Sequence, residues 1–294
     1  MWNQLKTTIL LASMAGLLMV IGSLLGGYNG IIVAFVISLL FNAFAYFFSD
    51  KMVLNLYKAK PLDRNQYDWI YSMVEDLAQK SNIPMPKMWL VKTPMANAFA
   101  TGRNPKHASV AVTTGILDIL TTEELRGVLA HELSHVINRD ILVSSVAATM
   151  ASAIGYVANM MQNMAFWSSS SNNNKESRPN PIALLFMAIL MPIAASLIQL
   201  AISRSREYLA DESGAHLSHD PLALASALEK LQNNVPYAHL RDNDSARATT
   251  AHMFIVNPFT GQSISALFST HPPMKQRVER LRKINEQMLS DRLK

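Results

Sequence analysis

Residues 130–136 read Ala130-His131-Glu132-Leu133-Ser134-His135-Val136, and this stretch decides how the rest of the chain is interpreted. In a helix, His131 and His135 are four residues apart and lie one turn above the other on the same face. Their imidazole nitrogens can then reach one zinc ion at about 2.0–2.1 Å. Glu132 lies beside the ion in such a helix, where its carboxylate can take a proton from water. The stretch therefore predicts a helix that carries two metal ligands and a general base.

The residues that precede this stretch favour a helix over a chance match. Thr121 and Glu124 have the spacing of a capping box, and the acidic pair Glu123-Glu124 suits the positive end of a helix dipole. Apolar residues then recur at helical spacing, at Leu125, Val128, Leu129, Leu133 and Val136. We therefore predict a capped amphipathic helix with one face in a core.

The composition is that of a membrane protein. Of the 294 residues, 50% are hydrophobic and 16% are charged, whereas soluble domains have about 25% charged residues. The chain has no Cys, which excludes disulfides, thiolate metal sites and cysteine nucleophiles. The formal charge of +5 is modest and its basic residues cluster beside apolar segments. We interpret these basic residues as setting the orientation of the protein in the membrane, and we expect no nucleic-acid partner.

Two uncharged segments near the N-terminus, residues 7–25 and 30–48, are each long enough to span a bilayer core of about 30 Å. Only Gly26-Gly27-Tyr28-Asn29 separates them, so they predict a tight transmembrane helical hairpin. A cleaved signal peptide is the alternative for the first segment, but it has no convincing cleavage site and leads directly into the second. Lys6 precedes the hairpin and Lys51 follows it, so the positive-inside rule places both ends in the cytoplasm.

A second pair of uncharged segments comprises residues 141–167 and 181–203. We expect both to cross the membrane, the alternative being two buried or membrane-surface helices. Arg139 before the pair and Arg204 after it agree with a return to the cytoplasmic side. The predicted organisation is a two-helix membrane anchor at 1–49, a first catalytic part at 50–140, the apolar pair at 141–203 and a second catalytic part at 204–294.

The soluble parts read as a small sheet and several helices. Strands are predicted at residues 87–91, 97–102 and 108–113, with Arg103-Asn104-Pro105 as the turn between the last two. Helices are predicted at 67–80, 221–231 and 273–289, and an exposed loop at 241–251.

A catalytic zinc site usually has three protein ligands, so one more is needed. The extended metalloprotease motif would place Gly and His at the positions of Asn138 and Ile141, so that class is excluded. A carboxylate on a second helix remains, and Glu207 is the best candidate because Asp211 lies four residues on and could support a ligand. The alternative is a solvated charged turn outside a membrane segment. Three further histidines stay unassigned, namely His216, His219 and His252.

At this point the chain resembles the membrane-bound zinc endopeptidases of the HtpX type, which are relatives of the CAAX prenyl endopeptidases. The resemblance covers nearly the whole chain. It rests on residues 97–102, 131–135 and 203–211, and on Ser269-Thr270-His271-Pro272-Pro273 followed by Arg277 and Arg280. Together these stretches are highly specific for the family. Taken singly, the zinc motif is specific and the other three are not.

The resemblance implies that Glu207 is the third zinc ligand and that Asp211 supports the ligand shell. It also implies that His271 and Arg277 lie near the site, where His271 could stabilise the oxyanion formed when water attacks a peptide carbonyl. From the sequence alone, His271 is more typical of a loop residue.

In such enzymes the strand with Asn97, Ala98 and Phe99 resembles an edge on which substrate lies extended, bound by main-chain hydrogen bonds with little sequence preference. The small residues Ala98 and Ala100 would let a substrate backbone approach, and ordinary strand packing is the alternative for these two. The expected fold is a mainly α integral membrane protein, with a zincin-like α+β catalytic domain between the hairpin and the second apolar pair.

The expected function is zinc-dependent endoproteolysis of misfolded or damaged membrane proteins in stress-related quality control, with self-cleavage. One zinc ion per chain, the lipid bilayer and unfolded polypeptide substrates are the expected partners. The expected location is the bacterial cytoplasmic membrane, with both termini and the site in the cytoplasm. Two alternatives remain open. One is a narrow processing protease of the CAAX type, and the other is a non-catalytic membrane adaptor that contains zinc.

Overall fold

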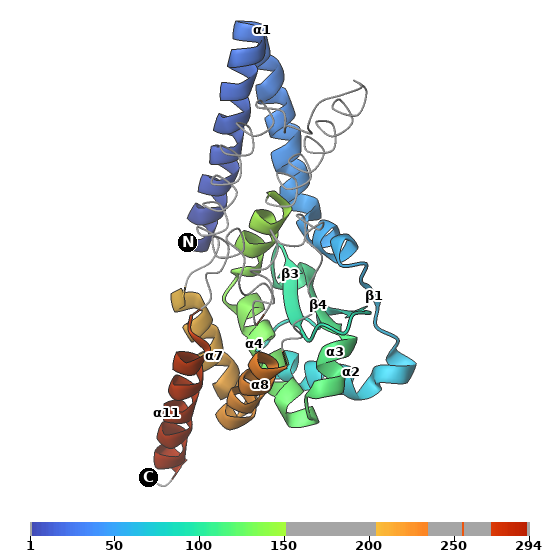
Figure 1. Cartoon of the computed structure of the whole chain (residues 1–294), viewed down its shortest axis with the longest axis vertical. Coiled ribbons are helices and arrows are strands. Elements are labelled where there is room, and N and C mark those ends of the chain that lie inside the picture. The colour runs from blue at the N-terminus through green and yellow to red at the C-terminus, as the bar shows by residue number, and fades with distance from the viewer. Residues whose placement is uncertain (1, 151–203, 235–254, 256–271, 293–294) are drawn as a thin grey trace, which may run out of the picture.

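The structure is a computed structural model, and it describes residues 2–150, 204–234, 255 and 272–292 (Figure 1). Several predictions fall outside these residues. They concern most of the second apolar pair, the loop at 241–251, and His252 and His271.

The N-terminal apolar residues form the helical hairpin that the sequence predicts. Helix α1 (Trp2–Leu56) is interrupted at Gly26 and Gly27, and its two legs lie side by side (Figure 1). The turn needs a positive φ of 55° at Gly27, a conformation that glycine adopts without steric cost. Across the legs, Asn42 Nδ2 donates a hydrogen bond to the carbonyl of Leu11 at 3.0 Å. The hairpin is therefore held by a polar contact as well as by the turn.

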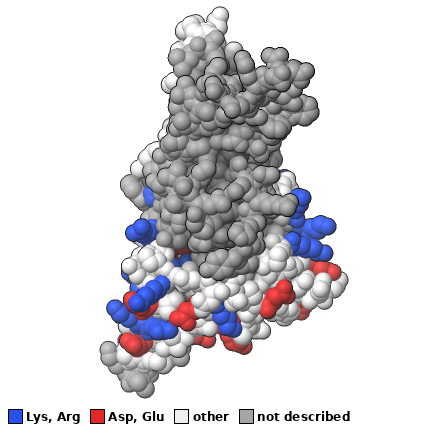
Figure 2. All heavy atoms as spheres, in the orientation of Figure 1, with Lys and Arg blue, Asp and Glu red and all other residues white. Residues whose placement is uncertain are grey.

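The surface of this hairpin is apolar. Within the described residues, one helix is long and apolar enough to cross a membrane, Gly26–Leu56, and Leu5–Val20 is a shorter apolar helix. The side chains of Val20 and Leu40 are 59% and 66% exposed. In Figure 2 the charged side chains in view lie on the body of the protein, and the tip of the hairpin has none. Insertion of both legs into a bilayer stays a prediction.

A four-stranded sheet follows in the order β1-β2-β4-β3. It contains β1 (Lys60–Pro61), β2 (Lys87–Val91), β3 (Ala98–Gly102) and β4 (Ala108–Thr113). The outer strand β3 is antiparallel to β4, while β2 is parallel to β4. The three longer strands confirm the predicted strands to within one residue, but β1 and the 3-10 helix η1 (Pro105–His107) have too few residues to produce a periodic signal.

Helix α4 (Thr122–Ile137) carries the His-Glu-x-x-His stretch, and its predicted cap is confirmed. Thr121 N donates to Glu124 Oε2 at 2.8 Å, and Glu124 N donates to Thr121 Oγ1 at 3.3 Å. The same Glu124 carboxylate accepts hydrogen bonds from Ser226 Oγ and Lys230 Nζ on α8 (Pro221–Asn233) at 2.7 and 2.8 Å. One side chain therefore caps α4 and ties it to a neighbouring helix.

Helices α2 (Arg64–Lys80) and α7 (Arg204–Ser218) pack against α4, as α8 does. Helices α3 (Thr114–Ile119) and α11 (Met274–Arg292) pack against α8. Buried apolar residues of α2, the sheet, α4, α8 and α11 form one core, which includes Ile70, Val110, Leu129, Leu228 and Leu281. The described helix Ile141–Met150 follows α4 and is almost entirely buried. These contacts fix α4 on several sides, so the side chains on its remaining face have fixed positions.

Candidate active site

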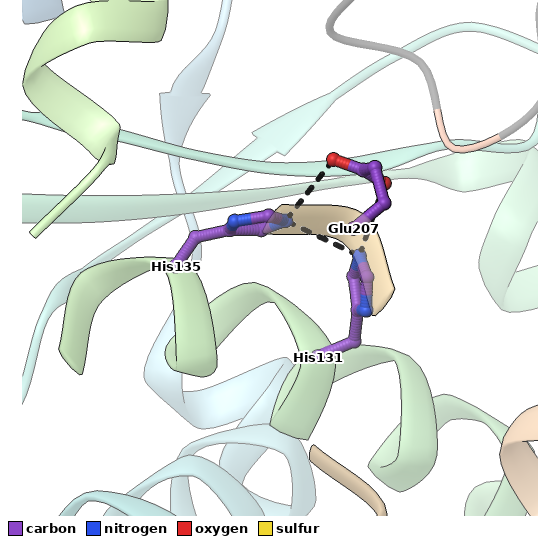
Figure 3. Close-up of side chains that lie close together, drawn as sticks. All are labelled: His131, His135 and Glu207. Carbon is purple, nitrogen blue, oxygen red and sulfur yellow. Dashed lines mark hydrogen bonds and ion pairs between the residues drawn. The ribbon is translucent and has the colours of Figure 1, made fainter. Parts of the chain in front are cut away.

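The two histidines of α4 and the glutamate of α7 converge on one point (Figure 3). The Nε2 atoms of His131 and His135 are 3.3 Å apart, with their rings perpendicular. Glu207 Oε2 lies 3.8 Å from His131 Nε2, and Glu207 Oε1 lies 3.7 Å from His135 Nε2. Two ligand atoms at tetrahedral zinc are about 3.3–3.4 Å apart, given bonds of about 2.0–2.1 Å. The histidine pair has this separation, and the carboxylate lies slightly farther away.

Helix α7 reaches this point because a glycine lets it approach α4 closely. A Cβ atom at Gly214 would lie 2.8 Å from the backbone nitrogen of His131, a contact too short for any other residue. Asp211 and Glu207 lie about one and two turns before Gly214, respectively, on the same side of α7. The contact at Gly214 thereby brings both carboxylates to the face of α4 that carries the histidines.

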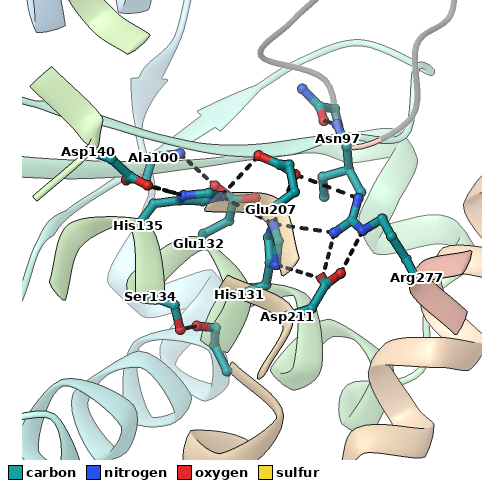
Figure 4. Close-up of polar contacts among 12 residues, drawn as sticks. Asn97, Ala100, His131, Glu132, Ser134, His135, Asp140, Glu207, Asp211 and Arg277 are labelled. Carbon is teal, nitrogen blue, oxygen red and sulfur yellow. Dashed lines mark hydrogen bonds and ion pairs between the residues drawn. The ribbon is translucent and has the colours of Figure 1, made fainter. Parts of the chain in front are cut away.

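Each histidine has a carboxylate behind it. His131 Nδ1 lies 3.0 Å from Asp211 Oδ1, and His135 Nδ1 lies 3.1 and 3.2 Å from the two oxygens of Asp140 (Figure 4). A carboxylate can only accept at this contact, so the arrangement favours the tautomer in which each Nδ1 carries the proton and each Nε2 presents a lone pair. Two lone pairs 3.3 Å apart repel each other unless a cation lies between them. The donor set therefore fits a divalent metal ion.

In the absence of a metal, a proton can serve as that cation. Burial alone would lower the pKa of His135, but the carboxylates of Asp140, Glu207 and Glu132 together outweigh burial and raise the pKa to about 10.

Arg277 of α11 completes the surroundings of His131. Its side chain is fully buried, and its Nε and Nη2 atoms bind the two oxygens of Asp211 at 2.8 and 2.7 Å. Burial alone would raise the pKa of Asp211, but Arg277 and His131 together outweigh burial and hold the pKa below its ordinary value. The same guanidinium approaches Glu207 Oε2 to 3.8 Å and His131 Nε2 to 3.5 Å. Arg277 therefore lies beside both His131 and Glu207 in this structure.

Glu132 lies between the sheet and the metal group, the name used here for His131, His135 and Glu207. Its side chain is buried, and its Oε2 atom accepts a hydrogen bond from the backbone N–H of Ala100 in β3 at 2.9 Å. Burial raises the pKa of this carboxyl above its ordinary value, which is the direction expected of a group that accepts a proton near neutral pH. The carboxylate is thus held between the metal group and the outer strand.

Strand β3 has an alternating hydrogen-bond pattern, and within the described residues β4 is its one neighbouring strand, so its other edge is called the free edge below. Thr113 N donates to Asn97 O at 3.0 Å, so the main-chain groups of Asn97 and every second residue after it face β4. The groups of Ala98, Ala100 and Gly102 face the other way. The Ala100 N–H binds Glu132, and the Gly102 N–H donates to Ser145 Oγ at 3.2 Å.

The other predicted substrate residues have packing roles in this structure. The Phe99 ring contacts the ring of Tyr57 at the base of α1, with centroids 5.3 Å apart. The Asn97 side chain accepts a hydrogen bond from Ile255 N at 3.0 Å. All five residues of β3 are buried.

The unassigned histidines of α7 and its following turn are not part of the group. His216 and His219 are exposed, and the metal-binding group found among the described residues consists of His131, His135 and Glu207. Sequence reasoning missed Asp140, although it lies only five residues after His135.

A helix that carries a His pair and an intervening Glu, completed by a carboxylate from a second helix, defines a metal-dependent peptidase. The comparison with protein families agrees and gives the particular group. The chain belongs to peptidase family M48, whose profile matches residues 64–285.

Relatives extend the match to nearly the whole chain. The protease HtpX homolog of Syntrophobacter fumaroxidans is 50% identical over 283 residues, which cover 96% of this chain and 99% of the relative. Protease HtpX of Legionella pneumophila is 49% identical over 282 residues, again covering 96% and 99%. A crystal structure of Ste24p from S. mikatae is 17% identical with a TM-score of 0.48, and the match covers 95% of this chain and 65% of that one.

Proposed function

We propose that this metallopeptidase is a zinc endopeptidase of the bacterial cytoplasmic membrane that hydrolyses misfolded or damaged membrane proteins and cleaves itself. The observation that carries the proposal is the pair of facing Nε2 atoms, 3.3 Å apart and each backed by a carboxylate. His131, His135 and Glu207 would hold the ion. The relatives named as HtpX proteases support this assignment.

The chemistry follows from the groups around that point. A bound zinc ion would supply Lewis acidity toward a peptide carbonyl and toward water. Glu132 would accept the proton of the attacking water and return it to the leaving amine, so that one water is consumed for each C–N bond broken. The resemblance adds His271 as a donor to the oxyanion. Arg277 would keep Asp211 ionised, which fixes the orientation of His131.

Substrate would lie along the free edge of β3. The main-chain groups of Ala98 and the carbonyl of Ala100 face this edge, and such groups bind an extended chain with little preference for sequence. Because β3 is buried in this structure, substrate entry would require a change around the strand. The position of the hairpin next to the same strand supports a membrane-protein substrate.

Location in the membrane rests on the exposed apolar hairpin and on where its ends lie. The N-terminal end of α1 lies at the same end of the hairpin as the catalytic body (Figure 1), as expected if both ends are cytoplasmic. The second apolar pair, residues 141–203, would add two crossings and complete the division into anchor and two catalytic parts.

Cleavage of casein by detergent-purified, zinc-loaded protein tests the function. We expect Glu132→Gln to abolish cleavage while zinc, measured by metal analysis, is retained, and Glu207→Ala to lose zinc as well. Glu123→Gln is the matched control, since Glu123 is an exposed carboxylate on the same helix, and should cleave at the wild-type rate. Undiminished cleavage by Glu132→Gln would overturn the mechanism. Inactive wild-type protein with a full complement of zinc would favour the adaptor alternative.

A further inference from the structure

The turn that ends α4 brings Asp140 back to the metal site. Asp140 N donates to His135 O at 3.2 Å, and Arg139 N donates to Val136 O at 3.2 Å, which together form a Schellman turn. Arg139 takes the left-handed position of this turn with φ 56°. The chain therefore reverses within a few residues, and the Asp140 carboxylate ends beside His135 with 2% of the residue exposed.

The same residue starts the next helix, and that helix contacts the sheet one turn later. Ser144 N donates to Asp140 O at 3.3 Å, so Asp140 stands at the start of Ile141–Met150. Farther along, the fully buried Ser145 hydroxyl lies 2.7 Å from Thr101 Oγ1 and accepts from Gly102 N at 3.2 Å. It also donates to the carbonyl of Ile141 at 2.7 Å.

These contacts place the short helix Ile141–Met150 between the end of α4 and strand β3, and so link the position of the one to that of the other. Its first end supports a metal ligand, and its second turn holds the outer strand two residues from Ala100, which binds Glu132. Ser145 occupies the Gly102 N–H, which would otherwise be the next donor on the free edge of β3.

We propose that Asp140 is the positioning residue of His135 and that Asp140 and Ser145 together brace α4 against β3. Asp140 holds the His135 proton on Nδ1 and leaves Nε2 for the metal. Ser145 sets the distance of the strand from that ligand and marks one end of the edge open to substrate. The role of Ser145 at the substrate edge rests on the proposed function, because it assumes that β3 binds substrate.

Zinc affinity, measured by competition with a chromophoric chelator, tests Asp140 without reference to proteolysis. Groups that orient a metal ligand are worth about 10–100-fold in metal affinity. We expect Asp140→Asn, whose amide oxygen can still accept the proton of Nδ1, to weaken zinc binding roughly tenfold, and Asp140→Ala up to about 100-fold. Asp76→Asn is the control, because it removes a paired carboxylate on α2 away from the site and should bind zinc as wild type does.

The melting temperature of the zinc-free protein separates positioning from folding. If Asp140 positions His135, the melting temperature of zinc-free Asp140→Asn stays near that of zinc-free wild type, and the increase in melting temperature on adding zinc is smaller. A purely structural role lowers the zinc-free temperature and leaves the zinc affinity of the folded protein unchanged. A loss of affinity smaller than about fivefold in Asp140→Ala, or in Asp140→Asn if the alanine variant does not fold, would overturn the assignment.

Kinetics on an unfolded substrate test Ser145. We expect Ser145→Ala to keep wild-type zinc affinity and kcat while KM rises roughly tenfold, the equivalent of one buried hydrogen bond. Ser144→Ala is the matched control on the same helix, since the Ser144 hydroxyl makes none of these contacts. An unchanged KM in Ser145→Ala, or a loss of zinc, would refute the brace. If wild-type protein cleaves nothing, the proposed function fails, whereas the zinc measurements on Asp140 still decide its role.

Discussion

The two histidines of the metal group are supported in different ways. His131 depends on tertiary packing, because Asp211 comes from α7 and is itself held by Arg277 of α11. His135 depends on a local turn, because Asp140 lies five residues later in the same stretch of chain. The first support requires three helices to meet, and the second requires only that α4 end correctly. The His131 side should therefore be sensitive to distant substitutions, and the His135 side to changes in the turn.

The largest effect is expected on the His131 side, at Arg277. Arg277→Met would leave the buried Asp211 carboxylate without its cation, which costs about 3–5 kcal/mol in comparable pairs. We expect this loss in the free energy of unfolding of the zinc-free protein, measured by urea denaturation in detergent. Arg282→Ala is the control in the same helix, because it removes an exposed pair with Glu229 that is worth about 1 kcal/mol or less. Equal losses in the two variants would contradict a special role for the buried pair.

A smaller effect is expected where α7 meets α4. Gly214→Ala would force α7 away from the His131 backbone, and overpacking of this kind costs about 1–3 kcal/mol. Zinc affinity should fall in parallel, since Glu207 and Asp211 move with α7. Gly16→Ala provides the comparison, because a Cβ at Gly16 would meet nothing within 4 Å. Wild-type zinc binding by Gly214→Ala would mean that α7 can adjust without moving its carboxylates.

Glu124 tests the start of α4, which both sides share. Burial alone would raise its pKa, but Lys230, the Thr121 backbone and Ser226 outweigh burial and hold it below the ordinary value of 4.5. The stabilisation is therefore present above 4.5 and is lost as the pH falls through the lower pKa of the folded state. We expect Glu124→Gln to cost about 1–2 kcal/mol at pH 7.

The pH dependence of unfolding provides the check on Glu124. The difference between wild type and Glu124→Gln should shrink as the pH is lowered below 4.5, the ordinary value. A difference that is constant between pH 7 and pH 3 would show that shape, rather than charge, accounts for the effect.

The smallest effect is expected on the His135 side, at the left-handed residue of the turn. Arg139 has φ 56°, and Arg139→Gly should relieve this strain and stabilise the protein by roughly 0.5–1 kcal/mol, with zinc affinity unchanged. Asn82→Gly is a useful comparison because Asn82 has φ 53°, which asparagine tolerates better. A destabilised Arg139→Gly would indicate that the arginine side chain contributes more than its backbone costs.

The sequence predicted those parts of the fold that leave a periodic or capped pattern. The capping box at Thr121 and Glu124 and the apolar repeat of α4 are local, so they could be identified directly. The same holds for the short apolar strands β2 and β4 and for the glycine turn of the hairpin. Strand β1 and helix α3 (Thr114–Ile119) are stabilised by their neighbours rather than by their own pattern, so neither could be predicted from a local pattern of residues.

The site was predictable to the extent that its residues share a helix. His131, Glu132 and His135 follow from spacing, and Glu207 with Asp211 follows from the same spacing together with the family resemblance. Asp140 could not be found in this way, because its position depends on a left-handed backbone at an arginine, which the sequence does not reveal. Nor could the sequence show that Ala100 binds Glu132, since that contact depends on which edge of β3 is free.

The second leg of α1 remains helical from Tyr28 to Leu56, well beyond Phe48, the last apolar residue before Ser49 and Asp50. At 1.5 Å per residue, the part after Phe48 is about 12 Å long, and the ring of Tyr57 then meets Phe99 of β3. If the hairpin is embedded in the membrane as far as Phe48, the catalytic site of the protein is held at a fixed height above the bilayer. The length of a substrate's exposed segment, more than its sequence, would then decide whether it is cut.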